Sequence, residues 1–289
     1  MSTNHGLPFD IAIAGLGIVG THQITKEVEE TIRRSKQTFV IANAIGVATY
    51  LRTLCPKVIN MSSIRPGVHR RLVYRRMASM VVSAALDNAP VCFATYGHPK
   101  LYCYPATLVQ RAARVLNLRV QVFPGISCLD TLMVDLNIDP ALDGLQIYDA
   151  TDMVVRRRPL QNDVSCVVLQ APIVMEAYST EGPAKAENAE ILQKYLLEFY
   201  PPEHRAILLV TRTHPLLDSV RQAIPLGSLA AALQRSPNLG TLFIPPLRQR
   251  EVADRHLADR LKVPESHKAA ETAGPARRPG RPPIGPKRE

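Results

Sequence analysis

The feature that most constrains the fold is a regular alternation of short apolar segments with longer segments of helical periodicity. Glycine or proline separates most of them. This alternation is typical of βαβ units, which build a largely parallel sheet covered by helices. We predict strands at 10–14, 38–42, 90–95, 118–123, 164–169, 205–211 and 241–244, and helices at 23–35, 70–88, 105–116, 186–199 and 226–234.

The pattern is interrupted near the middle by Pro124 and Gly125. We expect one α/β lobe at 1–123 and a second at 124–250, with a ligand cleft between them. The remainder, 251–289, differs: a charged, helical lead-in that begins at Arg248 is followed by a tail rich in proline and arginine that contains no aromatic residue. Such a tail cannot bury a core and is expected to be disordered.

Composition excludes several classes of protein. No apolar run approaches the roughly 20 residues of a membrane helix, and the N-terminus lacks the pattern of a secretory signal. The five cysteines are scattered without a C-x-x-C pair, which argues against disulfides and a zinc site. We expect a cytoplasmic protein with no metal. The net charge of +10 is compatible with nucleic acid, a membrane surface or an acidic ligand.

The first predicted strand ends in a glycine loop, Gly15-Leu-Gly17-Ile-Val-Gly20. Glycines there allow a tight turn and a close approach of ligand to backbone. A nicotinamide dinucleotide would need an acid after the second strand, where this chain has Asn43. A structural turn and another adenosine-containing cofactor remain as alternatives.

Four segments in order resemble the S-adenosylmethionine-dependent tetrapyrrole methylase superfamily. They are 11–25 with the glycine loop, 94–99 (Ala-Thr-Tyr-Gly-His-Pro), 124–152 and 240–246. Within it the chain is most similar to the borosin-type peptide backbone α-N-methyltransferases. The similarity lies in the Tyr-Gly-His-Pro stretch, in Asp-Leu-x-x-Asp-Pro at 135–140, and in Arg70-x-x-x-Tyr74-x-x-Met77.

The resemblance implies a two-lobed fold, commonly a homodimer, that holds S-adenosylmethionine in the cleft through backbone groups. Residues after the predicted strand 90–95 would form one wall, 127–128 would lie under the methionine part or the ribose, and two later segments would close around the adenine. The implied cofactor-binding residues are Gly15, Gly17, Tyr96, Gly97, His98, Leu101, Tyr102, Ser127, Cys128, Gln170, Ala171, Gly240, Thr241 and Leu242.

The resemblance also suggests how the acceptor could be activated. Arg70 and Tyr74 are four residues apart and would share a helix face. A tyrosinate could take the proton of an amide, and the arginine could stabilise the phenolate or the developing imidate oxygen. The alternative is an ordinary amphipathic helix with a solvated basic face. The segment Asn-Met-Ser-Ser-Ile at 60–64 lacks a further tyrosine that the borosin enzymes carry.

The predicted function is therefore methylation of a separate ribosomal peptide, on nitrogen. Proline has no backbone N–H to methylate, which disfavours the chain's own tail as the acceptor. Alternatives are C-methylation of a tetrapyrrole or another small molecule, and a non-catalytic cofactor- or DNA-binding protein. Arg277–Arg281 resembles a single AT-hook that could contact DNA, and the alternative is a solvated basic tail. Arg156–Arg158 could contact an acidic leader peptide or the carboxylates of a ligand, or be solvated.

Overall fold

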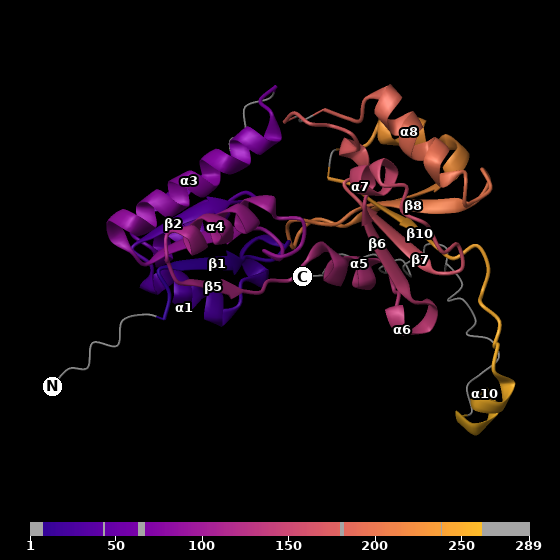
Figure 1. Ribbon diagram of the computed structural model, residues 1–289, viewed down its shortest axis with the longest axis horizontal. Helices are drawn as coiled ribbons and strands as arrows, with labels where there is room; N and C mark the ends of the chain where they lie inside the picture. The colour runs from indigo at the N-terminus through magenta and orange to yellow at the C-terminus, as the bar shows by residue number, and fades with distance from the viewer. Residues whose placement is uncertain (1–7, 43, 63–66, 180–181, 238, 262–289) are drawn as a thin grey trace, which may run out of the picture. The chain divides into compact units, whose positions relative to one another are not determined.

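The computed structural model describes residues 8–261 except 43, 63–66, 180–181 and 238. The chain divides into two compact units, Met1–Leu247 and Arg248–Glu289. The first unit contains two five-stranded sheets, one built from residues before 124 and the other from residues after 144 (Figure 1). The described part of the second unit holds one helix, α10 (Arg255–Leu261).

The first sheet is parallel throughout, as the sequence predicts. Its strands are β1 (Ile11–Gly15), β2 (Gln37–Ile41), β3 (Val58–Asn60), β4 (Val91–Thr95) and β5 (Val120–Phe123), in the order β3-β2-β4-β1-β5. The interior strand β1 pairs with both β4 and β5 and is buried along its whole length. Burial on both faces explains why the strand is apolar at every position rather than alternating.

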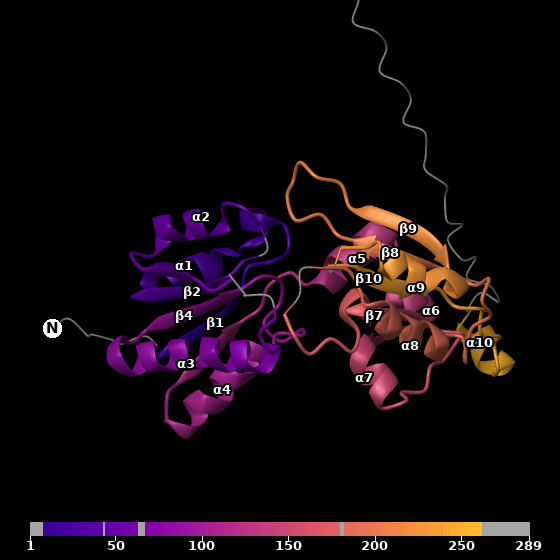
Figure 2. The same ribbon diagram turned by 90° about the horizontal axis from the view of Figure 1, so that it is seen from above.

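Helices cover both faces of this sheet. One face packs against α1 (Lys26–Arg34) and α2 (Val47–Leu54), and the other packs against α3 (Arg70–Asn88) and α4 (Tyr104–Val115) (Figure 2). Neighbouring residues of β1 serve opposite cores: Ala12 packs with the first pair of helices and Ile13 with the second. This alternation is the normal consequence of the strand pleat.

The second sheet differs from the predicted parallel arrangement. Its strands are β6 (Leu145–Asp149), β7 (Ser165–Leu169), β8 (Arg205–Val210), β9 (Val220–Pro225) and β10 (Thr241–Ile244), in the order β6-β7-β10-β8-β9. Only β6 and β7 are parallel; β10 runs antiparallel to both β7 and β8, and β9 antiparallel to β8. The short link between β8 and β9 contains no crossover helix, and antiparallel strands need none.

The helices of the second sheet also divide between its two faces. On one face pack α7 (Ala150–Val155), α8 (Ala186–Leu196) and α9 (Leu229–Leu233); on the other packs α5 (Cys128–Leu136). Four short turns complete the unit: α6 (Pro140–Asp143), η1 (Gly20–Gln23), η2 (Ala171–Ile173) and η3 (Leu226–Ser228). Among the described residues, no helix combines the length and apolar character that a bilayer span requires.

Candidate functional site

A cavity of about 510 Å³ lies at the carboxyl ends of the strands of the first sheet. The strand register aligns Gly15 and Ile41 with Thr95, so the loops after β1, β2 and β4 start at one edge. In the second sheet, β10 is antiparallel to β7 and β8, so its first residues lie beside the last residues of those two strands. The antiparallel strand thereby brings Gly240 and Thr241 to the same cavity as Gln170 and Thr211.

Most of the residues implied by the resemblance line this cavity. They come from α3, from the loop after β4, from the start of α5, and from the edge of the second sheet. The lining includes Arg70, Tyr74, Tyr96, Gly97, His98, Leu101, Tyr102, Cys128, Gln170, Gly240 and Thr241.

Five of the implied residues are absent from the lining: Gly15, Gly17, Ser127, Ala171 and Leu242. Ser127 caps α5, because its hydroxyl and backbone N–H both donate to the Asp130 carboxylate while its oxygen accepts from the helix. Ala171 and Leu242 are fully buried in the second core. These three side chains therefore support the wall rather than forming its surface.

The glycine loop is a structural turn whose amides are already bonded within the protein. The Gln23 Oε1 accepts the backbone N–H groups of Ile18, at 2.7 Å, and of Val19, at 2.8 Å. Gly17 has φ of +77°, and a Cβ there would come within 2.3 Å of the Gln23 Cβ. The amides that would bind a pyrophosphate in a dinucleotide site therefore bind the Gln23 side chain instead. Asn43, which stands where a dinucleotide site would need an acid, lies outside the described residues.

Three backbone segments approach one another closely behind the cavity wall. A Cβ on Gly15 would lie 2.6 Å from the Gly97 carbonyl oxygen and 2.7 Å from the Gly125 Cα. The Gly97 N–H donates to the Gly17 carbonyl at 2.8 Å, and Gly97 itself has φ of +66°. Glycine at these positions lets the loop after β4 turn across the glycine loop and present its own backbone to the cavity.

The start of α3 is fastened to the second half of the unit by backbone pairing. The Gly67 N–H donates to the Ser179 carbonyl at 3.0 Å, the Ser179 N–H to Val68 at 2.9 Å, and the Arg70 N–H to Ala177 at 3.0 Å. The Arg70 guanidinium also donates to the Glu176 carbonyl. These contacts hold the two residues of the predicted acceptor site, Arg70 and Tyr74, at the cavity.

The turn that receives Arg70 has its own buried anchor, Glu176. This side chain is only 8% exposed; its carboxylate accepts the Tyr178 N–H at 3.0 Å and pairs with the Lys185 ammonium at 2.8 Å. The hydrogen bond from Lys185 is the main reason that the pKa of Glu176 lies below its usual value, and the Tyr178 N–H adds to the effect. The carboxylate is therefore charged at neutral pH and fixes the turn.

Several ionisable side chains on the wall are held in their neutral forms. Burial raises the pKa of Tyr96, to which Cys103 and Tyr74 add. Burial, together with Asp149 and Asp152, raises the pKa of Tyr102 to about 12. Burial likewise raises the pKa of Cys128 to about 11. The raised pKa values make the phenolates of Tyr96 and Tyr102 harder to form than that of an unperturbed tyrosine, so these two side chains are poor candidates for a base.

Some lining residues had no signal in the sequence. Ser62, Ser179, Thr211 and Thr213 all contribute to the wall. The Ser62 hydroxyl bonds the backbone of Ala42 in both directions, at 2.8 and 3.1 Å. It belongs to the 60–64 segment, of which Ser63 and Ile64 lie outside the described residues.

Ser179 differs from the other polar lining residues. It is 9% exposed, and its buried hydroxyl has no hydrogen-bond partner among the residues that the structure describes. Buried polar groups normally find a partner. The hydroxyl lies just beneath the cavity wall, so a small movement of the wall would let it bond an occupant of the cavity.

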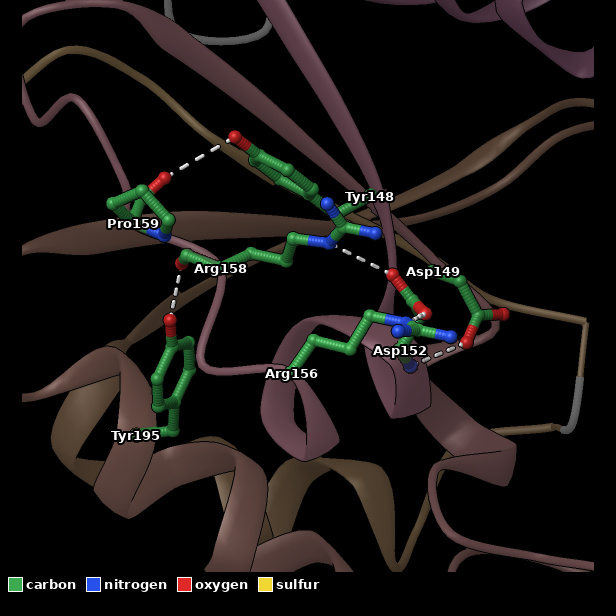
Figure 3. A network of polar contacts seen from close by, with 7 residues as sticks. All are labelled: Tyr148, Asp149, Asp152, Arg156, Arg158, Pro159 and Tyr195. Carbon is green, nitrogen blue, oxygen red and sulfur yellow. Dashed lines mark hydrogen bonds and ion pairs between the residues drawn. The ribbon is translucent and has the colours of Figure 1, made fainter.

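The arginines at 156–158 are paired with acids of their own half of the unit. Asp152 accepts from Arg156 at 2.6 Å and from Arg158 at 3.0 Å (Figure 3). Arg157 pairs with Glu198 at 2.5 Å and lies over the Tyr195 ring. The structure thus gives each of these side chains a partner within the chain, where the sequence suggested contact with an acidic leader peptide.

Among the described residues, no cluster of histidine, cysteine, aspartate or glutamate side chains could hold a metal ion. The cavity offers backbone groups, hydroxyls, one arginine and a mostly apolar surface. Such a site binds an organic ligand by shape and by a few polar contacts.

Known structures share this architecture. The uroporphyrin-III C-methyltransferase of Thermus thermophilus superposes with a TM-score of 0.58 at 15% identity, covering 89% of this chain and 97% of that one. Another structure of that enzyme, complexed with S-adenosyl homocysteine, gives 0.55 at 14% identity, covering 81% and 91%. At these identities the likeness shows the fold alone.

Sequence relatives point to a narrower group. The methyltransferase/cyclic peptide dendrothelin A precursor of Dendrothele bispora is 23% identical over 87% of this chain. A methyltransferase/type I borosin cyclic peptide precursor of Serendipita vermifera subsp. bescii is 24% identical over 91%. The alignments span only 61% and 65% of those relatives' lengths.

The strands, loops and cavity described above fall largely within one matched region. The sequence profile of the tetrapyrrole (corrin/porphyrin) methylases matches residues 10–213, from β1 through the loop after β8. This match covers more than half of the chain. The chain belongs to the tetrapyrrole (corrin/porphyrin) methylase family.

Proposed function

We propose that this protein is an S-adenosylmethionine-dependent methyltransferase that N-methylates a separate ribosomal peptide. The observation that carries the proposal is the joint placement of Arg70 and Tyr74 on the wall of the cavity that also contains the cofactor segments of the family resemblance. Peptide substrates are favoured over tetrapyrroles because the sequence relatives cited above are named as methyltransferase and cyclic peptide precursors.

The residues present fit S-adenosylmethionine. The cavity volume of about 510 Å³ lies in the usual range for small-molecule sites. Backbone at Gly97 and Gly240, hydroxyls at Thr95 and Thr241, and apolar Leu101 would hold it. A Cβ at Gly240 would come within 3.2 Å of Pro172 and 3.1 Å of Leu208, so a larger residue there would press on these two side chains. When bound, the cofactor supplies a methyl group on a sulfonium sulfur.

Tyr74 would manage the proton of the acceptor. An amide nitrogen is a weak nucleophile because its lone pair is delocalised into the carbonyl, so the N–H proton must leave as the new N–C bond forms. Tyr74 as the phenolate would accept that proton. Its ring packs edge-to-face against Tyr104, with 6.2 Å between the ring centroids, which limits its motion at the cavity wall.

Arg70 would stabilise the negative charge that moves onto the amide oxygen as the proton leaves. One of its N–H groups donates to the Glu176 carbonyl. A guanidinium has several donors in a rigid plane, so others remain for the acceptor. The bond to Glu176 fixes the orientation of that plane before the acceptor arrives, which lowers the cost of positioning in the reaction.

The test is mass spectrometry of the purified protein incubated with S-adenosylmethionine and peptides encoded near its gene. We expect a peptide that gains the mass of one or more methyl groups on backbone nitrogen. The Tyr74→Phe variant should lose at least about a hundredfold in rate, the lower range for a general base, while it still binds cofactor. Tyr104→Phe is the matched control, because that hydroxyl lies outside the cavity lining. Methylation of tetrapyrroles alone, or full activity of Tyr74→Phe, would contradict the proposal.

The assembly and compartment are part of the same proposal. We expect a homodimer, which the family resemblance supports and light scattering would test. A reducing, cytoplasmic location is supported by the cysteines, all five of which are free thiols. The suggested DNA contact through Arg277–Arg281 lies outside the described residues and stays a prediction.

A further inference from the structure

The first two turns of α3 carry a basic surface formed by Arg71, Arg75 and Arg76, here named the α3 arginine surface. All three side chains are exposed, and none has an ion-pair partner among the residues that the structure describes. The first turn of the helix contains no acidic residue. In this respect the surface contrasts with Arg156–Arg158, each of which is paired within the chain.

This arrangement is electrostatically unfavourable in the free protein. The amino end of a helix carries partial positive charge, so cations in its first turns are repelled by the helix as well as by one another. Arg71 and Arg75 are four residues apart and lie in one row of the helix surface. An acidic partner would relieve that repulsion, which gives the surface a preference for negatively charged binding segments.

Exposed apolar side chains lie among these arginines. Leu72 is 45% exposed and Met80 is 44% exposed, and with Arg76 they form a second row at four-residue spacing. The surface therefore alternates cationic and apolar groups along the outer side of α3. A partner with both carboxylates and apolar side chains matches this pattern, whereas a nucleic-acid backbone would leave the apolar groups without a role.

The surface is continuous with the candidate site. Arg70, in the same turn as Arg71, lines the cavity, and Tyr74 follows one turn later. The arginine surface and the cavity-lining residues share one helix, which is about 10–12 Å across with its side chains, a distance that three or four extended residues cover. A bound peptide could therefore place an acidic segment on the surface within a few residues of the segment that enters the cavity.

We propose that the α3 arginine surface binds an acidic, partly apolar segment of the peptide substrate and so delivers the rest of that peptide to the cavity. This inference rests on the proposed peptide methylation for its biological role, but the binding can be measured without turnover. Exposed charges of this kind act mainly on encounter rate and register, so the binding should weaken with salt.

The direct test is fluorescence anisotropy of the full-length chain with a labelled 20-residue peptide that carries glutamate and leucine at helical spacing. We expect binding at physiological salt, and at least about tenfold weaker binding when each glutamate of the probe is replaced by glutamine. The triple variant Arg71→Gln/Arg75→Gln/Arg76→Gln should show the same loss. The matched control Arg52→Gln/Arg111→Gln/Arg221→Gln removes three exposed arginines elsewhere and should bind as the unmodified protein does.

Equal binding by the triple variant, or equal binding of the glutamine probe, would overturn the proposal. A labelled 20-base-pair duplex that binds more tightly than the peptide and loses its affinity in the triple variant would also overturn it, in favour of nucleic acid. Because the three side chains are exposed and unpaired among described residues, the variant should fold; an unchanged melting temperature and unchanged affinity for S-adenosylhomocysteine verify this.

Kinetic measurements of methyl transfer distinguish a failure of this inference from a failure of the proposed function. With a peptide that is methylated, the triple variant should raise KM with little change in kcat, the pattern of lost substrate binding. Methylation that is unaffected by the triple variant would reject the surface and leave the proposed function intact. Binding of the acidic probe without methylation of any peptide would leave the surface intact and reject the function.

Discussion

At the scale of single residues, Ser179 illustrates a contact that sequence patterns do not reveal. It sits in a loop with no motif, and its position depends on backbone pairing with Gly67 and Val68, more than 100 residues earlier. Arg70 and Tyr74, by contrast, were implied by the family resemblance, and their spacing accounts for their shared position, since a helix places residues four apart on one face. Sequence can indicate that two residues of one helix lie together. It does not indicate a position that depends on the pairing of distant segments.

The Ser179 hydroxyl gives the first residue-scale prediction. Ser179→Ala should leave the free energy of unfolding unchanged or slightly raise it, because it removes a buried polar group that lacks a partner among described residues. The same change should weaken binding of cofactor or acceptor by about 0.5–1.5 kcal/mol, the usual worth of one hydrogen bond. Urea unfolding and calorimetric titration with S-adenosylhomocysteine measure the two effects.

Ser62→Ala provides the comparison for this measurement. Its hydroxyl also lines the cavity but is bonded to Ala42, so its loss should cost stability instead. If Ser179→Ala lowered stability and left the binding of both cofactor and acceptor unchanged, the hydroxyl would be structural.

At the scale of elements, the sequence best predicts helices and strands whose apolar pattern is visible within the segment alone. The bounds of α3 agree with the predicted helix, and β10 agrees with the predicted strand. The strand β9 was missed because nearly all its residues are exposed, which removes the apolar signal of a strand. The pairing of β10 between β7 and β8 was missed because short apolar strands do not indicate direction.

The turn containing Glu176 gives the element-scale prediction. Glu176→Ala removes the bonds to Lys185 and Tyr178, so the turn that receives the Arg70 guanidinium should become loose. We expect kcat to fall by about tenfold, the order expected when a positioned group loses its fixed geometry, while cofactor affinity is retained. Glu176→Gln should keep the bond to the Tyr178 N–H and retain more activity.

A pH series distinguishes this positioning role from general destabilisation. The pKa of Glu176 is lowered in the folded protein, so its stabilising contribution is present above the unfolded value of about 4.3 and disappears as pH falls through the folded pKa. The difference in unfolding free energy between the unmodified protein and Glu176→Gln should therefore shrink between neutral pH and pH 3. A difference independent of pH would show that the carboxylate charge is not what fixes the turn.

At the scale of the whole molecule, family membership follows from several motifs in order rather than from any one of them. The glycine loop alone suggested a dinucleotide site, yet its amides are bonded by Gln23. What the sequence could not define is the meeting of Arg70 with the turn at Glu176, because that contact joins segments far apart in the chain. Long-range contacts of this kind depend on how both sheets pack, which no local pattern specifies.

The division of the chain into two units gives the last prediction. Every residue that lines the cavity belongs to the unit Met1–Leu247, whereas the Arg-Pro-Gly-Arg-Pro sequence at 278–282 belongs to the other. Deletion of 265–289 should therefore leave kcat and KM for methyl transfer unchanged, since no cavity residue is removed. The same deletion should abolish binding to an A·T-rich duplex if the arginines insert into its minor groove.

The double variant Arg278→Ala/Arg281→Ala separates sequence-specific contact from simple charge. It keeps the length of the tail and most of its basic residues, so it should lose A·T preference while it retains weak, salt-sensitive binding. Fluorescence anisotropy with A·T-rich and G·C-rich duplexes at two salt concentrations measures both the A·T preference and the salt-sensitive, non-specific binding. Equal binding of the two duplexes by the unmodified protein would show that the tail is a non-specific basic segment. A lower kcat after deletion of 265–289 would show that the tail acts on the site.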